Sequence, residues 1–211
     1  MAGRVITIAQ RKGGAGKTTL AAQLAVAWAR QGAKLALLDI DPQASLSAWV
    51  GLRRARLGDT AIGFEFAALP GWRAEQWIAD HAREADLVIV DSPPHIETEA
   101  RIAVRAAGLL LIPVQPSPLD LWATAATIAI ARDERRRMLA VLNRVAPRST
   151  VTERIAGELS QAGTPLAASR IGNRIALVQA MAQGLGVLET AATSPAAAEV
   201  TALADEIRGI G

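Results

Sequence analysis

The sequence predicts an α/β domain in which a mostly parallel sheet is covered by helices on both faces. Five short apolar segments alternate with longer segments of helical character, and a glycine-rich loop directly follows the first of them. Continuously apolar strands indicate a sheet buried on both faces, because an exposed face would place polar side chains at every second position. The 211 residues suit one such domain, so we expect a single domain over residues 1–211.

The elements follow from local patterns along the chain. The expected strands cover residues 5–9, 35–39, 87–90, 109–114 and 138–142. The expected helices cover residues 18–31, 119–137 and 195–208. Ser117 and Ser194 mark the beginnings of the last two helices, since each precedes a proline, which is favoured in a first helical turn. Residues 51–71 are rich in glycine and arginine and follow no regular pattern, so they stay unassigned.

Composition excludes several classes of protein. The chain has no cysteine, which excludes disulfides, thiolate metal sites and iron–sulfur clusters. No apolar run reaches the ~18 residues that a membrane span requires, and we expect no membrane partner. The first residues lead into a strand and a glycine-rich loop rather than a signal peptide. We therefore expect a cytoplasmic protein.

The glycine-rich loop has the residues that bind a nucleotide phosphate. It consists of Lys12, Gly13, Gly14, Ala15, Gly16, Lys17, Thr18 and Thr19. Backbone amides of such a loop, and of the helix that follows it, point at the anion. We expect Lys17 to contact the β- and γ-phosphates and the Thr18 hydroxyl to hold Mg²⁺. The loop predicts a P-loop nucleotide hydrolase that uses ATP; a glycine-rich turn without a ligand is the alternative.

A second lysine distinguishes this loop from the common one. The common pattern, G-x-x-x-x-G-K-[ST], needs glycine where this chain has Arg11, whereas the deviant pattern K-G-G-x-G-K-[ST] matches and adds Lys12. The chain uses 20 arginines and only three lysines, of which Lys12 and Lys17 lie here, which suggests a need for a compact ammonium rather than the planar guanidinium of arginine. In this loop the sequence resembles the ParA/MinD family of deviant Walker-A ATPases, most closely its short plasmid- and chromosome-partition members.

The resemblance implies roles for Lys12 and three aspartates. In the family the signature lysine, here Lys12, crosses a nucleotide-sandwiched dimer and contacts the partner's phosphates. The segment Leu37-Leu38-Asp39-Ile40-Asp41-Pro42-Gln43 and the apolar run that ends at Asp91 also resemble the family. Asp39 is then expected near the metal, Asp41 at the hydrolytic water, and Asp91 near Mg²⁺ through a water. A solvated loop charge at Lys12 and a polar turn after residue 39 are the alternatives.

Two more positions are assigned by resemblance to the adenine side of the nucleotide. Asn143 ends the last expected strand, where the family often places an amide that reads adenine; a capping or turn asparagine is the alternative. Pro116 lies in a segment, 113–120, that resembles the proline-rich segment of short partition ATPases. Proline restricts φ, so Pro116 is expected to wall the adenine or to meet the dimer partner, or only to end a strand.

Positive charge is concentrated between residues 132 and 174. This segment has nine arginines and four acidic residues, a net charge of nine minus four, or +5. Such a surface suits the phosphate backbone of DNA. We expect DNA contacts from Arg174, which by resemblance follows a strand after Gly163, and from Arg135, Arg136 and Arg137. For those three, a solvated helix end is the alternative, because cations there complement the helix dipole.

The resemblance covers nearly the whole chain and implies an ATPase that partitions plasmid or chromosomal DNA over the nucleoid. Its expected partners are a second copy bound through ATP, non-specific DNA, and a ParB-like or centromere-binding adaptor that stimulates hydrolysis. One alternative is a related ATPase that positions a protein cluster or organelle. Others are a small-molecule ATP-dependent synthetase, which has no use for Lys12 in trans, and a nucleotide-binding module without turnover, which Asp41 disfavours. The C-terminal segment lacks the basic amphipathic face of a membrane-binding helix.

Overall fold

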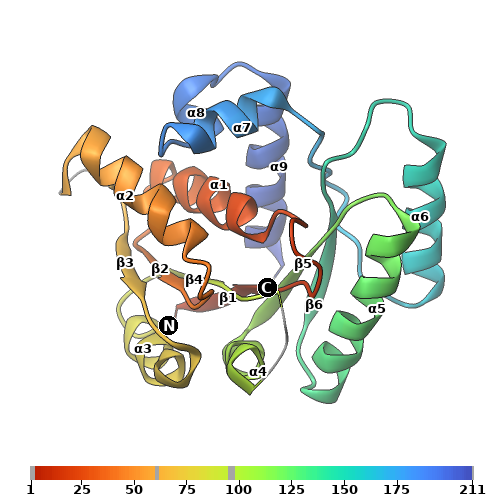
Figure 1. Ribbon diagram of the computed structural model, residues 1–211, viewed down its shortest axis with the longest axis horizontal. Coiled ribbons are helices and arrows are strands. Elements are labelled where there is room, and N and C mark those ends of the chain that lie inside the picture. Colours follow the sequence, from red (N-terminus) through yellow and green to blue (C-terminus); the bar gives the residue numbers. More distant parts are fainter. Residues whose placement is uncertain (1–2, 60–61, 95–97, 211) are drawn as a thin grey trace.

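A six-stranded sheet forms the centre of the computed structural model, which describes residues 3–59, 62–94 and 98–210 (Figure 1). Its strands are β1 (Arg4–Ile8), β2 (Leu35–Asp39), β3 (Glu65–Ala68), β4 (Leu87–Asp91), β5 (Leu109–Val114) and β6 (Met138–Leu142). They lie in the order β3-β2-β4-β1-β5-β6, and every neighbouring pair is parallel. The predicted α/β fold with a parallel sheet is confirmed.

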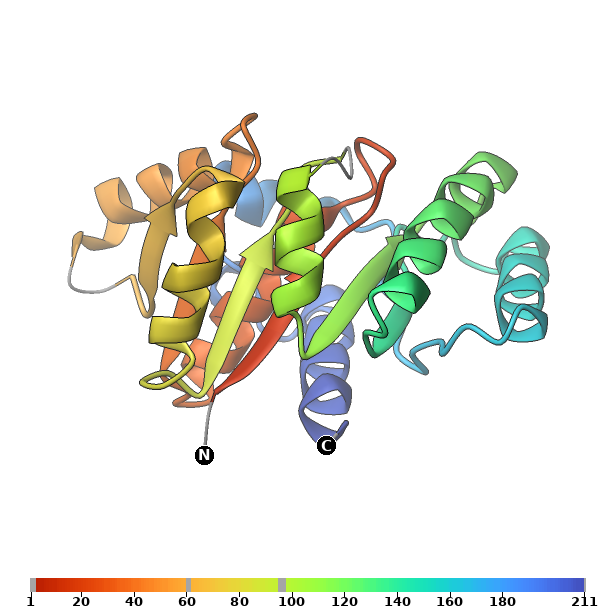
Figure 2. The same ribbon diagram turned by 90° about the horizontal axis from the view of Figure 1, so that it is seen from below.

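Helices cover both faces of this sheet, as Figure 2 shows. One face carries α1 (Lys17–Arg30), α2 (Ser45–Leu57), α7 (Ile175–Ala182), α8 (Val187–Thr190) and α9 (Pro195–Gly209). The other face carries η2 (Gly71–Arg73), α3 (Ala74–His81), α4 (Thr98–Ala106), α5 (Pro118–Asp133) and α6 (Thr150–Gln161). Within the described ranges, no helix has the length and apolar character needed to cross a membrane.

The core is divided by the sheet because successive side chains of a strand point to opposite faces. Ile89 of β4 packs with α1 and α9, whereas its neighbour Val88 packs with α3 and α4. Trp28 of α1 is fully buried, and its Nε1 donates to the Ala204 carbonyl of α9 at 3.1 Å. α1 is thereby fixed between the sheet and α9. This packing holds the first turn of α1 at the carboxyl end of β1.

Residues 51–71, which the sequence left unassigned, contain the end of α2 and the edge strand β3. β3 has only four residues, Glu-Phe-Ala-Ala, and all four are exposed or partly exposed. A strand this short shows neither an apolar run nor an alternation of apolar and polar residues. It forms because the backbone of β2 offers it a parallel partner, which is information that the local sequence does not contain.

The helix expected over residues 119–137 ends earlier. α5 stops at Asp133, and Arg135 has a left-handed φ of 52°, with the Arg136 amide donating back to the Ala131 carbonyl at 2.8 Å. This bonding pattern terminates a helix. Arg135, Arg136 and Arg137 therefore form the turn before β6 and do not end a helix, which corrects that prediction.

The strand expected after Gly163 is also absent from the described part of the chain. Residues 164–173 run beside β6 but form only two isolated bridges, Leu166 with Ala140 in the middle of β6 and Gly172 with Val145 beyond its carboxyl end. Arg174 follows this extended segment as the residue that caps α7.

Candidate nucleotide site

The glycine-rich loop lies between β1 and α1, at the carboxyl edge of the sheet. Gly14 and Gly16 have φ values of 75° and 97°, which residues with a Cβ adopt only at a cost. A Cβ on Gly16 would also lie 2.2 Å from Nδ2 of Asn143. The path of the loop therefore requires glycine at position 16 for two independent reasons, and it leads directly into the first amides of α1, where an anion is favoured.

Two amide side chains from neighbouring strand ends hold the loop in place. Asn143 Nδ2 donates to the Ala15 carbonyl at 2.8 Å, and Gln115 Nε2 donates to the Gly14 carbonyl at 2.7 Å. Asn143 Oδ1 also accepts the Arg144 amide at 3.0 Å, so both ends of this amide bond to backbone. Its contact with adenine stays a prediction. Sequence reasoning missed Gln115, although a glutamine between two prolines directly after a strand was a usable signal.

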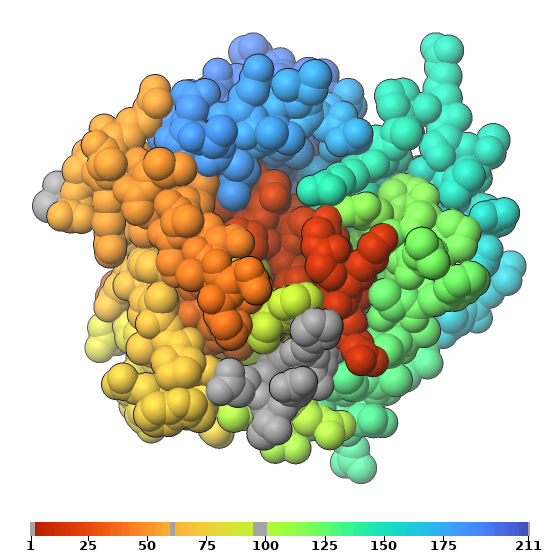
Figure 3. Space-filling view, in the orientation of Figure 1, coloured from red at the N-terminus to blue at the C-terminus, as the bar shows by residue number. Residues whose placement is uncertain are grey.

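A cavity of about 390 Å³ opens beside the loop. It is lined by Gly13, Gly14, Gly16, Lys17, Thr18, Thr19, Asp41, Gln43, Ser45, Pro94, Arg144 and Met181. Figure 3 shows the surface hollowed where the red loop, the orange segment after β2 and the blue α7 segment meet. Burial lowers the pKa of Lys17, while Asp91 and Asp41 raise it. An anion in the cavity would offset the cost of burying this ammonium.

Thr18 and Asp91, both expected at the metal, are in direct contact. Thr18 Oγ1 donates to Asp91 Oδ2 at 2.7 Å. The other oxygen, Oδ1, is buried and has no hydrogen-bond partner among the residues that the structure describes. The pKa of Asp91 is raised to about 7, mainly by burial and also by the charges of Asp39 and Asp41, against the lowering effects of the Thr18 hydrogen bond and Lys17. A carboxylate oxygen without a partner beside a hydroxyl, among carboxylates, fits a divalent cation such as Mg²⁺.

Asp39 and Asp41 differ in what they contact. Asp39 Oδ2 accepts the Ser47 amide at 2.9 Å and the Ser47 hydroxyl at 2.6 Å, and its Oδ1 accepts the Asp41 amide at 3.0 Å. Asp39 therefore fixes the segment after β2 to the first turn of α2. Asp41 lines the cavity, with Oδ1 accepting the Gln43 amide at 2.9 Å. Ser47 was missed by sequence reasoning because a serine near a helix start has many uses.

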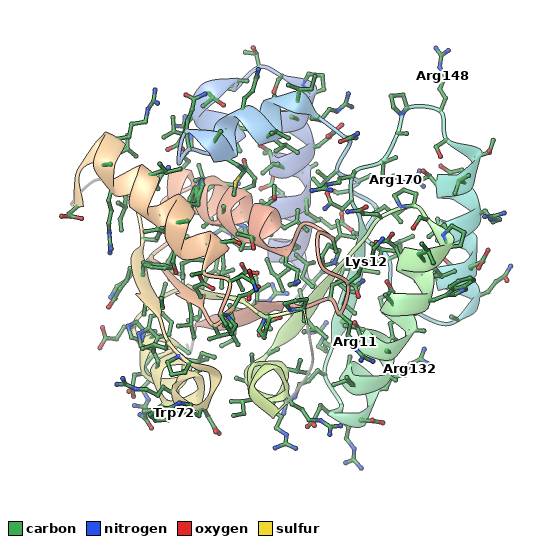
Figure 4. The ribbon with its side chains drawn as sticks, in the orientation of Figure 1. Arg11, Lys12, Trp72, Arg132, Arg148 and Arg170 are labelled. Carbon is green, nitrogen blue, oxygen red and sulfur yellow. The ribbon has the colours of Figure 1, made fainter. Side chains whose placement is uncertain are left out.

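Lys12 is paired within its own chain. Its Nζ lies 2.5 Å from Oδ2 of Asp120, and in Figure 4 the Lys12 side chain lies beside α5. Asp120 is 1% exposed, its Oδ2 also accepts the Ser117 hydroxyl, and its Oδ1 has no partner in the described part of the chain. Lys12 is thus the nearest cation to a buried carboxylate, and its contact in trans stays a prediction.

A smaller cavity of about 220 Å³ adjoins the first one. Its lining is Thr19, Asn143, Arg144, Gly172, Asn173, Arg174, Leu177, Val178 and Met181, of which Thr19, Arg144 and Met181 also line the larger cavity. An apolar wall with a few polar groups suits a flat ring. Pro116 lies in the turn between β5 and α5 and lines neither cavity.

The four arginines expected to contact DNA do not gather in one place. Arg174 is paired with Glu199, with Nη2 and Oε1 2.6 Å apart. Arg135, Arg136 and Arg137 are exposed at the amino end of β6, whereas Arg174 follows the segment bridged to its carboxyl end. A five-residue strand is about 16 Å long, so the two groups lie at opposite edges of the sheet.

The buried Asp91 carboxyl predicts a pH-dependent stability. Its pKa is raised from 3.8 to about 7 in the folded protein, so the folded state holds this proton more tightly than the unfolded state. The stability from this group is fully present below about pH 4 and is lost as the pH rises through about 7. In urea unfolding without nucleotide or Mg²⁺, Asp91→Asn should gain roughly 2–4 kcal/mol relative to wild type between pH 4 and 8. A difference independent of pH would show that Asp91 is ionised throughout.

The fold and this site define a nucleotide-binding protein of the P-loop class. The chain belongs to the family of CobQ/CobB/MinD/ParA nucleotide-binding domains, whose family model matches residues 6–187. The resemblance to ParA/MinD proteins is thereby confirmed.

Similar proteins align over most of the chain. The maintenance of carboxysome distribution protein A of Halothiobacillus neapolitanus is 28% identical, over 96% of this chain and 95% of its own length. The protein of the same name from Gloeobacter kilaueensis is 35% identical, over 88% and 84%. The chromosome-partitioning ATPase Soj of Thermus thermophilus is 30% identical, over 97% and 95%.

Solved structures confirm the fold. The cell division ATPase MinD of Pyrococcus furiosus has a TM-score of 0.84 at 22% identity, covering 99% of this chain and 100% of its own. MinD of Pyrococcus horikoshii, solved with Mg-ADP, has a TM-score of 0.82 at 21% identity, covering 98% and 96%. Cobyrinic acid a,c-diamide synthase of Mycobacterium smegmatis, solved with an ATP analogue and magnesium, has a TM-score of 0.78 at 20% identity, covering 96% and 93%.

Proposed function

We propose that this chain is an ATP hydrolase that dimerises when ATP is bound and, as a dimer, binds DNA without sequence preference. The observation that carries the proposal is a phosphate loop with two lysines in different surroundings. Lys17 lines the cavity beside Asp41, whereas Lys12 lies outside the cavity lining and is partly exposed. A loop that only bound nucleotide within one chain would need Lys17 but not Lys12.

The nucleotide's contacts follow from the cavity. The triphosphate binds the loop amides and Lys17, and the adenine occupies the smaller cavity beside Asn143. Thr18 would hold Mg²⁺, with Asp91 and Asp39 reaching it through water, and the metal would supply positive charge at the β- and γ-phosphates. Asp41 positions the attacking water from across the cavity, where orientation contributes most to phosphoryl transfer. Support for ATP and Mg²⁺ comes from the ligands named for similar folds, Mg-ADP and an ATP analogue with magnesium.

The dimer gives Lys12 its function. In the dimer Lys12 leaves Asp120 and contacts the phosphates held by the partner, so that ATP joins the two copies. A small-molecule synthetase is the alternative of another class, and the likeness to cobyrinic acid a,c-diamide synthase, at 20% identity, concerns the fold alone. Because such an enzyme has no use for a lysine in trans, the deviant loop favours an ATPase that alternates between an ATP-bound dimer and a monomer, which we call a dimeric switch.

The cargo of such a switch is either DNA or a protein body. The likeness to Soj favours partition of plasmid or chromosomal DNA through a ParB-like or centromere-binding adaptor. The likeness to two proteins named for carboxysome distribution favours a second candidate, the positioning of a protein body over the nucleoid. Both place the protein in the cytoplasm on the nucleoid. Crosslinking in cells with ATP-bound protein, followed by identification of the captured adaptor and its cargo, distinguishes them.

DNA binding by the wild-type protein is expected to require ATP. Two copies on one surface double the phosphate contacts, and each contact steepens the logarithmic salt dependence by nearly one unit. We therefore expect fluorescence anisotropy on unrelated duplexes to show equal affinities with ATP, loss of at least ~10-fold in affinity between ~50 and ~200 mM salt, and little binding with ADP. Strong sequence preference, or no DNA binding with ATP, contradicts the proposal.

A further inference from the structure

A third cavity, of about 230 Å³, lies at the start of α6, outside the nucleotide site. It is lined by Val145, Ala146, Arg148, Ser149, Thr150, Thr152, Glu153 and Arg170. We propose that this cavity binds a phosphate group, and that in the ATP-bound dimer the group belongs to the DNA backbone. The assignment to DNA rests on the proposed function, whereas the assignment to phosphate rests on the cavity itself.

The capping residue and first turn of α6 contribute Ser149, Thr150 and Thr152 to the lining of this cavity. The helix has 12 residues, and its capping residue Ser149 uses Oγ to accept the Thr152 amide at 3.2 Å. The amides of Thr150 and Val151 belong to the first turn, which has no intrahelical acceptors. Together with the helix dipole, these donors favour an anion with several acceptor oxygens.

The Thr152 hydroxyl is an independent sign of a ligand. Thr152 is 1% exposed and lines the cavity, yet its Oγ1 has no hydrogen-bond partner in the described ranges. Buried hydroxyl groups in native proteins nearly always have a partner. An oxygen of a phosphate group in the cavity would accept from this hydroxyl and satisfy it.

Two arginines line the cavity, and only Arg148 adds net charge to it. Arg148 is exposed, and among the described residues it forms no ion pair and its side chain forms no hydrogen bond. Figure 4 shows it at the tip of the loop between β6 and α6, pointing away from the body of the protein, with Arg170 closer to the body. Arg170 forms a two-pronged ion pair with Glu153, with Nη2 and Oε2 3.1 Å apart. The one carboxylate in the lining is therefore neutralised, and Arg148 leaves the cavity net positive.

The place of the cavity agrees with a DNA contact. The loop between β6 and α6 follows the carboxyl end of its strand, as the phosphate loop follows β1. A surface at this edge lies on the same side of the sheet as the ATP that joins the two copies. The turn of Arg135, Arg136 and Arg137 lies at the opposite edge of the sheet. Within the positive segment, residues 132–174, this cavity is therefore the better candidate for a DNA contact.

Thr152→Val tests the cavity with the least disturbance, because it replaces by a methyl group only a hydroxyl that has no partner among the described residues. With ATP, DNA affinity should fall about threefold to tenfold in Thr152→Val. Arg148→Ala should lower affinity for all sequences alike and reduce the logarithmic salt slope by one to two units, since the dimer has two copies. The matched controls are Thr164→Val, a second buried threonine whose Oγ1 has no partner in the described residues, and Arg56→Ala, an exposed arginine of α2. Both controls should bind DNA like wild type.

A second arm identifies the source of the phosphate. Titration with inorganic phosphate should shift the NMR amide signals of Thr150, Val151 and Thr152 in wild type, and the shifts should disappear in Thr152→Val. Shifts with unchanged DNA affinity in the variants indicate a free phosphate as the ligand. If neither affinity nor shifts respond to Thr152→Val and Arg148→Ala, the inference is wrong. If wild type binds no DNA with ATP, the proposed function fails, while the shifts still decide whether the cavity binds phosphate.

Discussion

Lys17→Ala is expected to abolish ATP binding. Lys17 is 7% exposed and lines the cavity in which the proposed function places the phosphates. Hydrogen bonds to charged groups in low-dielectric surroundings are the strongest that side chains make. Calorimetry with ATP and Mg²⁺ should show a loss of affinity of at least ~100-fold, equivalent to about 2.7 kcal/mol.

The control for Lys17→Ala is Lys34→Ala, which removes an exposed lysine near the amino end of β2 and should bind ATP normally. Circular dichroism should show that both variants are folded. Since Asp91 loses a neighbouring cation in Lys17→Ala, its pKa should rise further, and the comparison is best made at pH 8. Near-normal ATP affinity in Lys17→Ala would contradict the assignment of the phosphate loop.

Lys12→Ala is expected to bind ATP as a monomer and to lose ATP-dependent dimerisation. Light scattering with ATP and Mg²⁺ should give the mass of one chain for Lys12→Ala and the mass of two chains for wild type. The structure adds a second effect, because Lys12 is the cation paired with Asp120, which is 1% exposed. Removing it leaves a buried carboxylate unpaired, at a cost of roughly 1–3 kcal/mol in the free energy of unfolding.

The double variant Lys12→Ala/Asp120→Asn separates these two effects. Replacing the carboxylate by an amide removes the unpaired charge, so the stability should be largely restored. If Lys12 acts in trans, the double variant stays monomeric with ATP, and Asp120→Asn alone still dimerises. Recovery of the dimer in the double variant would show that Lys12 only keeps α5 in place, and an intact dimer in Lys12→Ala would remove the trans role altogether.

The sequence by itself determined most of the sheet and the identity of the phosphate loop. Five of the six strands were expected within one residue of their observed bounds, because each is a continuous apolar run. Gly14, Gly16 and Lys17 were recognisable because the loop, the strand before it and the helix after it are contiguous in the chain. Thr18 and Asp91 were both expected near Mg²⁺, but their direct hydrogen bond was not predicted, because it depends on β4 lying next to β1.

Only the tertiary structure decided which of the site's side chains bond to distant parts of the same chain. Lys12 and Asp120 are 108 residues apart, and Asn143 reaches Ala15 across 128 residues. These contacts exist because the sheet places β5 next to β1 and β6 next to β5, an order that no local pattern contains. The edge strand β3 has the same cause, since it forms against β2 rather than from its own four residues.

The positive segment shows the same division. Its charge could be counted from the sequence, but the left-handed turn at Arg135 and the pairing of Arg174 with Glu199 could not be predicted. Arg135, Arg136 and Arg137 lie at the opposite edge of the sheet from Arg174, because β6 carries the chain from its amino end to its carboxyl end between them. A solvent-exposed charged side chain does not pack in the core, so the hydrophobic pattern of the sequence does not predict where it lies on the folded surface. The role of such a charge therefore depends on the groups that the fold places around it. For Arg148, the proposed phosphate site depends on the nearby Thr152 hydroxyl and the first amides of α6.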